Sequence, residues 1–434
     1  MEASIYPSLI LSLFLLVLLL LGVPIAFALC TLGIVACLLW IGSGAIMQIV
    51  QTFYGTCSSD ILLCLPLFLF MAEVVVVAGI GEDLFNSIKI WTGRVRGGIA
   101  AATVVGCGMF AAVSGSSTAT IAAVGVIALM EMLRLGYKKS FASGTVGVGG
   151  TLGVMIPPSI IMILYGALAD QSIGKLFIAG VVPGMLMALG FVIVTLVQGY
   201  LRPESAPIST EKLSFARKMR VSRSVIPFVL IFLTMFYAFY TGIATPTEVA
   251  ALGVLASVCI GLAMRRLNLA KLFEATKRAG LTTAFVLFII AGAKFFTFTV
   301  SATGVSDLIT QSITGMGLGP IALVLVMMAV YLVMGCFIDP AGMLTLTIPF
   351  FLPALVSANV DLIWFGVLAT LLSEIGYCTP PFGFNLFVLK GVAPPEVAMS
   401  HIVKGVLPFL VVDFLLLVLL VLFPDLVLWL PSKM

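Results

Sequence analysis

Apolar residues form long runs along almost the whole chain, interrupted by short polar or glycine-rich stretches. A helix needs roughly 20 apolar residues to cross a bilayer core, and Ile5 to Trp40 contains no charged residue at all. This first run lacks the basic leading segment of a cleaved signal peptide, and similar runs follow to the end. The pattern predicts an all-α polytopic membrane protein.

From these runs we predict ten full spans and two hairpins. The spans are 5–21, 24–41, 60–80, 140–169, 175–199, 224–241, 247–264, 281–300, 361–391 and 402–423. The hairpins are 97–133 and 320–357, and each has two apolar arms around a polar tip.

The basic residues test this layout, because cytoplasmic loops of membrane proteins are enriched in Lys and Arg. With the N-terminus outside, the inside loops hold 19 of the 22 Lys and Arg residues. Only Lys175, Lys294 and Lys433 fall elsewhere. A wrong number of crossings would scatter the basic residues over both sides, so their distribution supports the predicted topology.

Both ends of the first hairpin lie inside, because Arg94 and Arg96 precede it and Arg134 follows it. Its tip, Ser114–Thr118, is a poor outer loop but a good buried turn. At about 1.5 Å per residue its arms reach roughly 25 Å, which is less than a ~30 Å bilayer core. We therefore expect a re-entrant hairpin. The second hairpin has almost no basic residue at its ends, so we expect it to enter from outside.

The two halves of the chain share the same spacing of motifs. Ser116 lies 41 residues before Pro157, and Asp339 lies 41 residues before Pro380. Each half holds five spans, an odd number, so the second half starts from the opposite side of the membrane. An inverted repeat with interrupted helices is typical of secondary transporters.

This repeat divides the chain into three parts. The first repeat covers 1–200, a basic cytoplasmic segment at 201–223 connects the halves, and the second repeat covers 224–434. Each repeat is expected to contain scaffold helices, one hairpin and one broken helix, the broken helices being 140–169 and 361–391.

Four breaks interrupt runs that would otherwise be helical: Ser114–Thr118, Gly149–Ser159, Gly335–Gly342 and Glu374–Gly383. Proline and glycine at these places free backbone carbonyls and amides at membrane depth. Such groups persist only where protein, water or ions satisfy them. Carbonyls of an unwound stretch suit a hard cation, and helix N-termini suit a carboxylate. We therefore expect two cation sites, each built from one tip and its facing Pro-Pro loop.

Charged residues inside apolar runs are usually functional. The candidates are Glu73, Glu248, Lys294, Asp339, Glu374 and Asp413. Asp339 and Glu374 lie in the breaks, where each is equally suited to bind a ligand or to cap a broken helix. Glu73 and Lys294 are more typical of structural pairing, and Asp413 of a water-filled crevice.

Composition agrees with a lipid environment and argues against enzyme chemistry. Hydrophobic residues make up 62% of the chain and charged residues 9%, whereas a soluble domain has about 25% charged residues. The eight cysteines form no C-x-x-C pair, and the one histidine, His401, lies in a basic segment. No phosphate-binding, dinucleotide-binding or hydrolase motif occurs. The net charge of +4 reflects basic loops and does not suggest nucleic acid.

Three motifs occur together at the breaks: Ser114-Gly115-Ser116-Ser117-Thr118-Ala119, Gly149-Gly150-Thr151-Leu152-Gly153 with Ile156-Pro157-Pro158-Ser159, and Gly376-Tyr377-Cys378-Thr379-Pro380-Pro381-Phe382-Gly383. In these residues, and nearly end to end, the chain resembles the large membrane subunit of TRAP (tripartite ATP-independent periplasmic) transporters.

The resemblance implies an elevator-type transporter with a scaffold, near 1–80 and 224–280, and a mobile domain with both hairpins and both broken helices. It implies sodium as coupling ion, with no other cofactor or metal, and a location in the bacterial inner membrane. It also implies two partners, a small four-helix membrane subunit and a periplasmic substrate-binding protein that delivers an organic acid. Because this chain starts directly at its first span, we expect the small subunit to be a separate polypeptide.

The resemblance also places ligands by position. One sodium ion would lie near Ser114, Ser117, Gly153 and Pro157. A second would lie near Gly335, Gly376 and Thr379. The solute would bind between the tips, with Ser116, Thr118, Asp339, Pro158 and Pro381 as candidate contacts.

The sequence therefore predicts a sodium-coupled uptake permease for an organic acid. C4-dicarboxylates, sialic acids, other sugar acids and keto acids all remain open as solutes. The main alternative is a self-sufficient sodium/anion symporter of related architecture that needs no binding protein. An ion channel and a membrane-embedded hydrolase are further alternatives, although a channel places its pore among subunits rather than between paired breaks of one chain.

Overall fold

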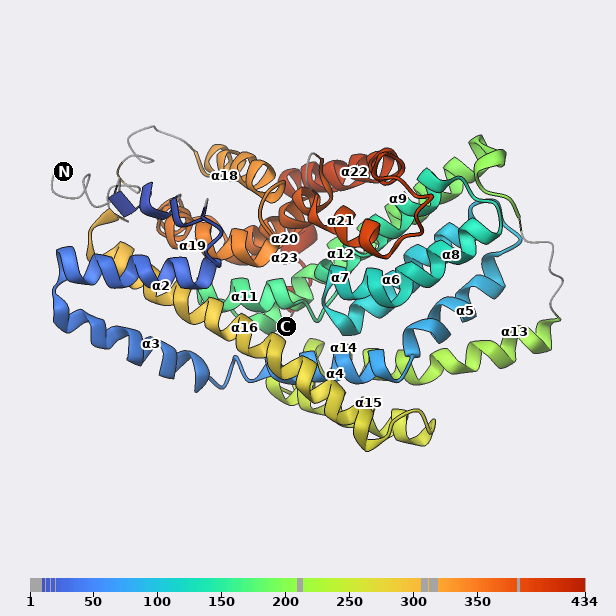
Figure 1. The fold of residues 1–434 in the computed structure, drawn as a ribbon, viewed down its shortest axis with the longest axis horizontal. Helices are drawn as coiled ribbons and strands as arrows, with labels where there is room; N and C mark the ends of the chain where they lie inside the picture. Colours follow the sequence, from blue (N-terminus) through green and yellow to red (C-terminus); the bar gives the residue numbers. More distant parts are fainter. Residues whose placement is uncertain are drawn as a thin grey trace.

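The computed structural model describes residues 10–433, except for residues 12, 16, 20, 209–213, 306–310, 312–318 and 381–382. Every regular element within these residues is a helix, as the apolar runs predict (Figure 1). The predicted span 5–21 falls partly outside the described residues, and so does one candidate solute contact, Pro381.

The order of helices is similar in the two halves. The first half contains α2 (Ile25–Ala36), α3 (Met47–Cys57), α4 (Cys64–Val77), α5 (Ile80–Thr92), α6 (Gly98–Ser114), α7 (Ser117–Thr120), α8 (Val126–Arg134), α9 (Lys139–Gly149), α10 (Leu152–Met155), α11 (Ile160–Ala169) and α12 (Ile173–Leu201). After α13 (Phe215–Ser222), the second half contains α14 (Ile226–Tyr240), α15 (Pro246–Ala263), α16 (Leu269–Ala302), α18 (Pro320–Gly335), α19 (Pro340–Ser357), α20 (Leu362–Cys378), α21 (Phe384–Val392), α22 (Met399–Leu422) and α23 (Asp425–Leu428).

Each predicted hairpin consists of two helices joined by a short turn. In the first, α6 ends at Ser114, Gly115 turns the chain with a φ of +59°, and the return helix begins at Ser117. The Ser116 hydroxyl caps this return helix by accepting a hydrogen bond from the N–H of Ala119 at 3.4 Å. In the second, α18 ends at Gly335 and α19 begins at Pro340. The entering arms are thus too short to cross a membrane alone, as predicted, whereas the return arms Ser117–Arg134 and Pro340–Ser357 are each long and apolar enough to do so.

Both predicted broken helices are also present. The chain bends by 40° between α10 and α11, where Pro157 and Pro158 stand in the break. The Ser159 hydroxyl restarts the helix by accepting a hydrogen bond from the N–H of Met162 at 3.2 Å. In the second half, α20 ends at Cys378 and α21 begins at Phe384.

The helices that the apolar runs did not predict are short. They are α3, α5 and α13, which connect longer helices. In addition, α16 has 34 residues and begins twelve positions before the predicted span 281–300. Six described helices are long and apolar enough to cross a membrane alone, and the bent pair adds a seventh. Several predicted spans, such as 60–80, correspond to apolar helices of 10 to 17 residues.

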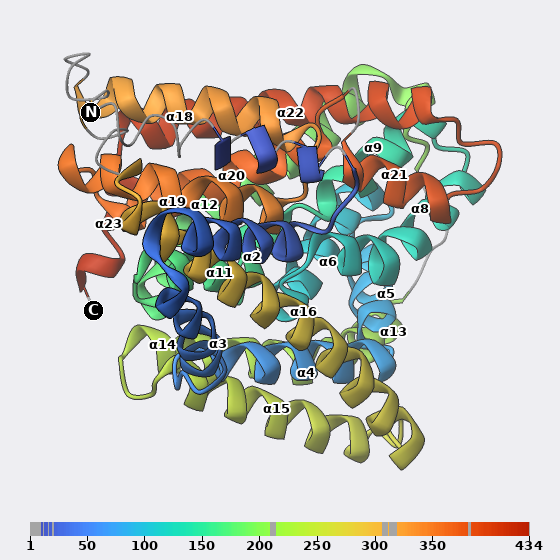
Figure 2. The ribbon, with the colours of Figure 1, turned by 60° about the vertical axis from the view of Figure 1, so that its left-hand side comes forward.

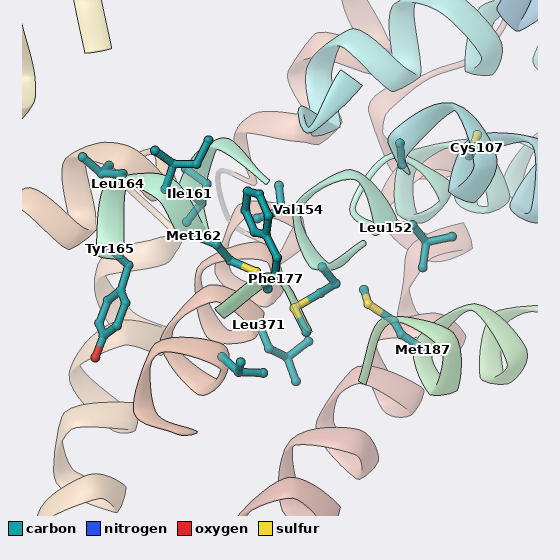
Figure 3. Close-up of a cluster of buried hydrophobic side chains, with 14 of the residues drawn as sticks. Cys107, Leu152, Val154, Ile161, Met162, Leu164, Tyr165, Phe177, Met187 and Leu371 are labelled. Atoms are coloured by element: carbon teal, nitrogen blue, oxygen red, sulfur yellow. The ribbon is translucent and has the colours of Figure 1, made fainter. Parts of the chain in front are cut away.

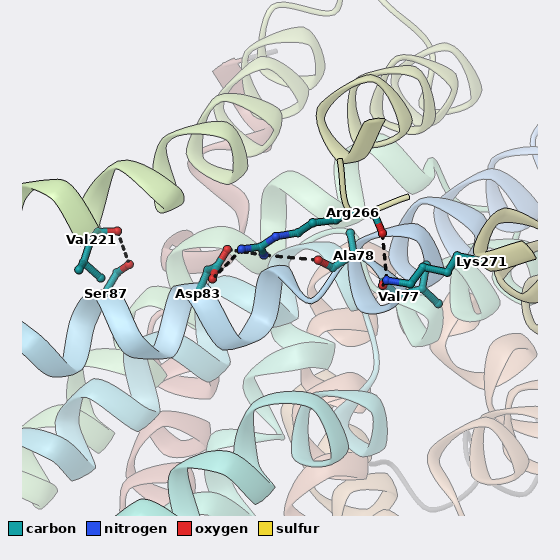
Figure 4. A network of polar contacts seen from close by, with 7 residues as sticks. All are labelled: Val77, Ala78, Asp83, Ser87, Val221, Arg266 and Lys271. Carbon is teal, nitrogen blue, oxygen red and sulfur yellow. Dashed lines mark hydrogen bonds and ion pairs between the residues drawn. The ribbon is translucent and has the colours of Figure 1, made fainter. Parts of the chain in front are cut away.

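Helices α4, α15 and α16 pack together as one group, with the hairpins and broken helices on the other side of α4 and α16 (Figure 2). Polar contacts fix one end of this group (Figure 4). Arg266, after α15, pairs with Asp83 of α5 at 2.6 Å, and the Lys271 ammonium donates to the carbonyl of Val77 at 3.1 Å. The turn between α4 and α5 is therefore bound to the turn between α15 and α16.

A second layer of packing surrounds the first broken helix (Figure 3). Met162 of α11 and Phe177 of α12 are fully buried, as is Leu371 of α20. The phenol of Tyr165 donates a 2.6 Å hydrogen bond to the carbonyl of Leu362. These contacts hold the first broken helix against the second one, so the two breaks share one packed core.

Candidate functional site

The first hairpin tip lies against the first Pro-Pro break. A Cβ atom on Gly115 would lie 2.5 Å from the carbonyl oxygen of Pro158, and the N–H of Ile160 donates to the carbonyl of Gly115 at 3.5 Å. A Cβ atom on Gly153 would lie 3.0 Å from the carbonyl oxygen of Ser116. Only glycine permits backbones to approach so closely. The predicted pairing of the tip with its facing loop is therefore present.

Hydroxyl groups crowd this tip. Ser114 and Thr120 share a hydrogen bond of 3.0 Å, and Ser116 and Thr118 share one of 3.1 Å. Ser114 and Ser117 are buried, with 5% and 3% of their surface exposed. Buried hydroxyl and carbonyl oxygens on a broken helix form an environment that suits a hard cation.

The second tip meets the second break in a similar way. A Cβ atom on Gly335 would lie 2.8 Å from the Cα of Gly376. Nearby, the Cys336 thiol donates a weak hydrogen bond to the carbonyl of Pro380 at 3.9 Å. The Thr379 hydroxyl donates to the carbonyl of Ile375 at 2.5 Å, at the end of α20. The N–H of Thr379 also donates to the carbonyl of Gly376 at 3.0 Å. The structure thus brings the three residues proposed for the second cation site close together, Gly335 from α18 and the other two from the end of α20.

One contact joins the two halves directly. The Ser117 hydroxyl of the first tip donates a 2.8 Å hydrogen bond to Oε2 of Glu374, which lies just before the second break. Glu374 is 1% exposed, and its Oε1 has no hydrogen-bond partner among the described residues. The sequence marked Glu374 as a charge within a break, but no local signal indicates Ser117 as its partner.

Asp339 acts as a helix cap. Its Oδ2 accepts a hydrogen bond from the N–H of Gly342 at 3.1 Å at the start of α19. Of the two roles left open for this residue, the structure shows capping. Glu248 likewise completes a capping box with Thr245 at the start of α15. Both carboxylates stabilise the first turn of a helix, where the helix dipole favours negative charge.

Pro157 and Pro158 face an apolar surface as well as the tip. They line a small apolar cavity that also includes Phe232, Met235 and Phe236 of α14. The first break therefore lies between the hairpin tip on one side and an aromatic helix of the second half on the other.

Comparison with known proteins identifies the family. The family model described as the tripartite ATP-independent periplasmic transporter, DctM component, matches residues 12–426. The chain is 34% identical to the C4-dicarboxylate TRAP transporter large permease protein DctM of Vibrio cholerae, over 95% of this chain and 94% of that protein. It is 31% identical to the ectoine TRAP transporter large permease protein TeaC of Halomonas elongata, over 95% and 96%.

A more distant relative and a solved structure agree with this result. The sialic acid TRAP transporter permease protein SiaT of Haemophilus influenzae is 31% identical over 86% of this chain and 60% of its own length. The crystal structure of the Alcanivorax borkumensis YdaH transporter shares the fold, with a TM-score of 0.59 at 13% identity over 96% of this chain and 98% of that one. The chain therefore belongs to the DctM family of TRAP transporter large permeases, which are multi-pass proteins of the bacterial inner membrane.

Proposed function

We propose that this permease imports an organic acid and is driven by a sodium gradient. The observation that carries the proposal is the close contact of each hairpin tip with a facing break, through Gly115 and Gly153 in the first half and Gly335 and Gly376 in the second. Such pairs place several backbone carbonyls at the end of broken helices. This chemistry coordinates sodium in secondary transporters.

One sodium ion would be held by oxygens near Ser114, Ser117, Gly153 and Pro157. The second would be held near Gly335, Gly376 and Thr379. The hydroxyls of Ser114 and Ser117 are buried, so an ion there would exchange its hydration shell for protein oxygens. Binding of the ion would therefore depend on the positions of the hydroxyl and carbonyl oxygens at the tip.

The solute would lie between the two tips, near Ser116, Thr118, Asp339, Pro158 and Pro381. The helices that begin after the first tip and after the second tip direct backbone N–H groups toward their starts, which favours an anion. Relatives named for C4-dicarboxylates, ectoine and sialic acid are named for compounds that bear a carboxylate, and one is named for isethionate, a sulfonate. An anionic acid group, which is a carboxylate in most of these compounds, is therefore what we propose for recognition.

The proposal includes two partners and a moving domain. A periplasmic binding protein would deliver the acid, and a small four-helix subunit would cover part of the scaffold, near 1–80 and 224–280. The hairpins and broken helices would move together as an elevator. Their shared core, around Met162, Phe177 and Leu371, supports movement as one body because close-packed interiors transmit strain rather than absorb it.

Uptake in proteoliposomes that contain all three components tests the proposal. We expect uptake of the cognate acid to require an inward sodium gradient and the binding protein. Uptake that continues when potassium replaces sodium would refute the coupling. Uptake that needs sodium but no binding protein would favour the self-sufficient symporter instead. Calorimetry on the partner binding protein would identify the acid.

A further inference from the structure

We propose a third sodium site in this permease, formed by Glu374, Asp413 and Asn385 and lying beside the first tip, whose Ser117 hydroxyl donates to the other carboxylate oxygen of Glu374. The inference rests on the proposed sodium coupling and extends it. It starts from three side-chain oxygens that are buried in the hairpin-containing part of the protein and have no partner.

Each of these side chains is almost completely buried. Glu374 is 1% exposed, Asp413 is 2% exposed and Asn385 is fully buried. Oε1 of Glu374, Oδ1 of Asp413 and Oδ1 of Asn385 all lack a hydrogen-bond partner among the described residues. A buried oxygen without a partner is costly, and a buried carboxylate without a positive charge is more costly still. A proton on each carboxyl or a bound cation can offset this cost, and we propose the cation.

The three side chains come from helices that pack together. Glu374 lies on α20, Asn385 on α21 and Asp413 on α22, and each pair of these helices is in contact. Cys378 lies one turn after Glu374 on α20, and the Asn385 amide donates to its sulfur at 3.7 Å. The carboxyls of Glu374 and Asp413 repel each other when both are charged.

No positive side chain neutralises this group. Neither Glu374 nor Asp413 forms an ion pair with any residue that the structure describes. Two carboxylates and an amide oxygen offer only hard oxygen ligands, which fits a small alkali cation rather than a transition metal.

The repeat shows that this group is not part of the two symmetric sites. Ser116 and Asp339 are 223 positions apart, as are Pro157 and Pro380. The same spacing relates Glu374 to Thr151, whose hydroxyl donates within its own helix to the carbonyl of Val148.

Beyond the breaks the spacing changes, because α11 and α21 begin 224 positions apart and α12 and α22 begin 226 positions apart. Helices α9, α10, α11 and α12 of the first half contain no Asp, Asn or Glu. The second half therefore carries a Glu, an Asn and an Asp on helices whose counterparts in the first half carry none of these residues. A site built from them adds to the symmetric pair.

Binding of radioactive sodium to the purified large and small subunits tests this site. We expect the Asp413→Asn variant to bind one sodium ion fewer per complex than the natural protein. The steepness of sodium-dependent uptake should fall to the same extent. Glu73→Gln is the matched control, because Oε2 of Glu73 also lacks a partner but lies on α4, away from this group. It should bind as much sodium as the natural protein.

A second variant covers the case in which an acid variant does not fold, as judged by its elution from a sizing column. Asn385→Ala keeps both carboxylates and should weaken the affinity of one sodium ion by roughly tenfold. The site is refuted if Asp413→Asn and Asn385→Ala both bind sodium as the natural protein does. It is also refuted if Asp413→Asn keeps its sodium count and loses only a dependence on the proton gradient, since the carboxyls would then carry protons. If the natural protein binds no sodium at all, the proposed coupling itself fails.

Discussion

The hydroxyl of Ser117 donates a hydrogen bond of 2.8 Å to Oε2 of Glu374, although 257 positions separate the two residues. This bond connects the tip of the first hairpin to the second broken helix. Because Glu374 lies two positions before Gly376, this bond joins the first proposed cation site to the segment that is proposed to hold the second.

Replacing Ser117 with alanine tests whether this bond holds the two halves together. We expect Ser117→Ala to reduce the stability of the protein by about 1–3 kcal/mol, because it leaves a buried carboxylate oxygen without a donor. The measurement is the thermal unfolding midpoint of the purified protein in sodium-free buffer, so that loss of a sodium ligand does not contribute.

Ser58→Ala is the control for this measurement. The Ser58 hydroxyl also donates a short hydrogen bond, of 2.7 Å to the carbonyl of Tyr54, but it does so within one exposed helix end. Its loss should leave the midpoint almost unchanged. Equal midpoints for Ser117→Ala and Ser58→Ala would mean that the Ser117–Glu374 bond does not stabilise the fold.

The second prediction concerns the close contact of Gly335 and Gly376. A Cβ atom on Gly335 would lie 2.8 Å from the Cα of Gly376, a distance that only a shift of the backbone can relieve. We expect Gly335→Ala to abolish sodium-dependent uptake while the protein still reaches the membrane. Gly280→Ala is the control, because a Cβ atom there meets nothing within 4 Å. Normal uptake by Gly335→Ala would show that this contact is not required.

The sequence predicted the hairpins and breaks because they depend on local chemistry. Glycine, proline and serine end and restart helices wherever they occur in an apolar run, so the turns at Gly115 and Pro157 can be located without a structure. Helices α3, α5 and α13 could not be found in this way. They are short or amphipathic, and they connect longer helices instead of crossing the membrane as apolar runs do.

The sequence also could not predict which residues contact the buried charged side chains. Glu374 was visible as an acid in an apolar run, and Asp339 as an acid at a tip. Which of them caps a helix depends on backbone direction at the break, and which of them contacts Ser117 depends on how distant helices pack. Neither property leaves a pattern in the neighbouring residues.

Two substitutions of Asp339 distinguish the effect of its negative charge from the effect of its helix-capping hydrogen bond. Asp339→Asn keeps an oxygen that accepts from the N–H of Gly342, whereas Asp339→Ala removes it. We expect the asparagine variant to keep near-normal stability and uptake, and the alanine variant to lose about 1 kcal/mol of stability, which is the usual effect of losing an N-cap. Thermal unfolding and uptake assays measure the two properties. If Asp339→Asn loses uptake but not stability, the charge itself takes part in solute or ion binding.

The last prediction concerns the ion pair between Asp83 and Arg266. It joins the turn after α4 to the turn after α15, and the two side chains are 19% and 37% exposed. Because solvent screens a partly exposed pair, we expect a coupling of only about 0.5–1 kcal/mol in a double-mutant cycle of Asp83→Asn and Arg266→Gln. Unfolding midpoints of the two single variants and the double variant provide the cycle.

The pair formed by Glu274 and Arg278 is the reference for this cycle, since it joins neighbouring turns of one exposed helix. Its coupling should be smaller than that of Asp83 and Arg266. The distinction matters for transport, because an elevator needs its scaffold to stay fixed while the other domain moves. Equal coupling in the two cycles would mean that the contact between α5 and the turn after α15 does no more than a surface pair, and that apolar packing of α4 against α15 alone keeps this region rigid.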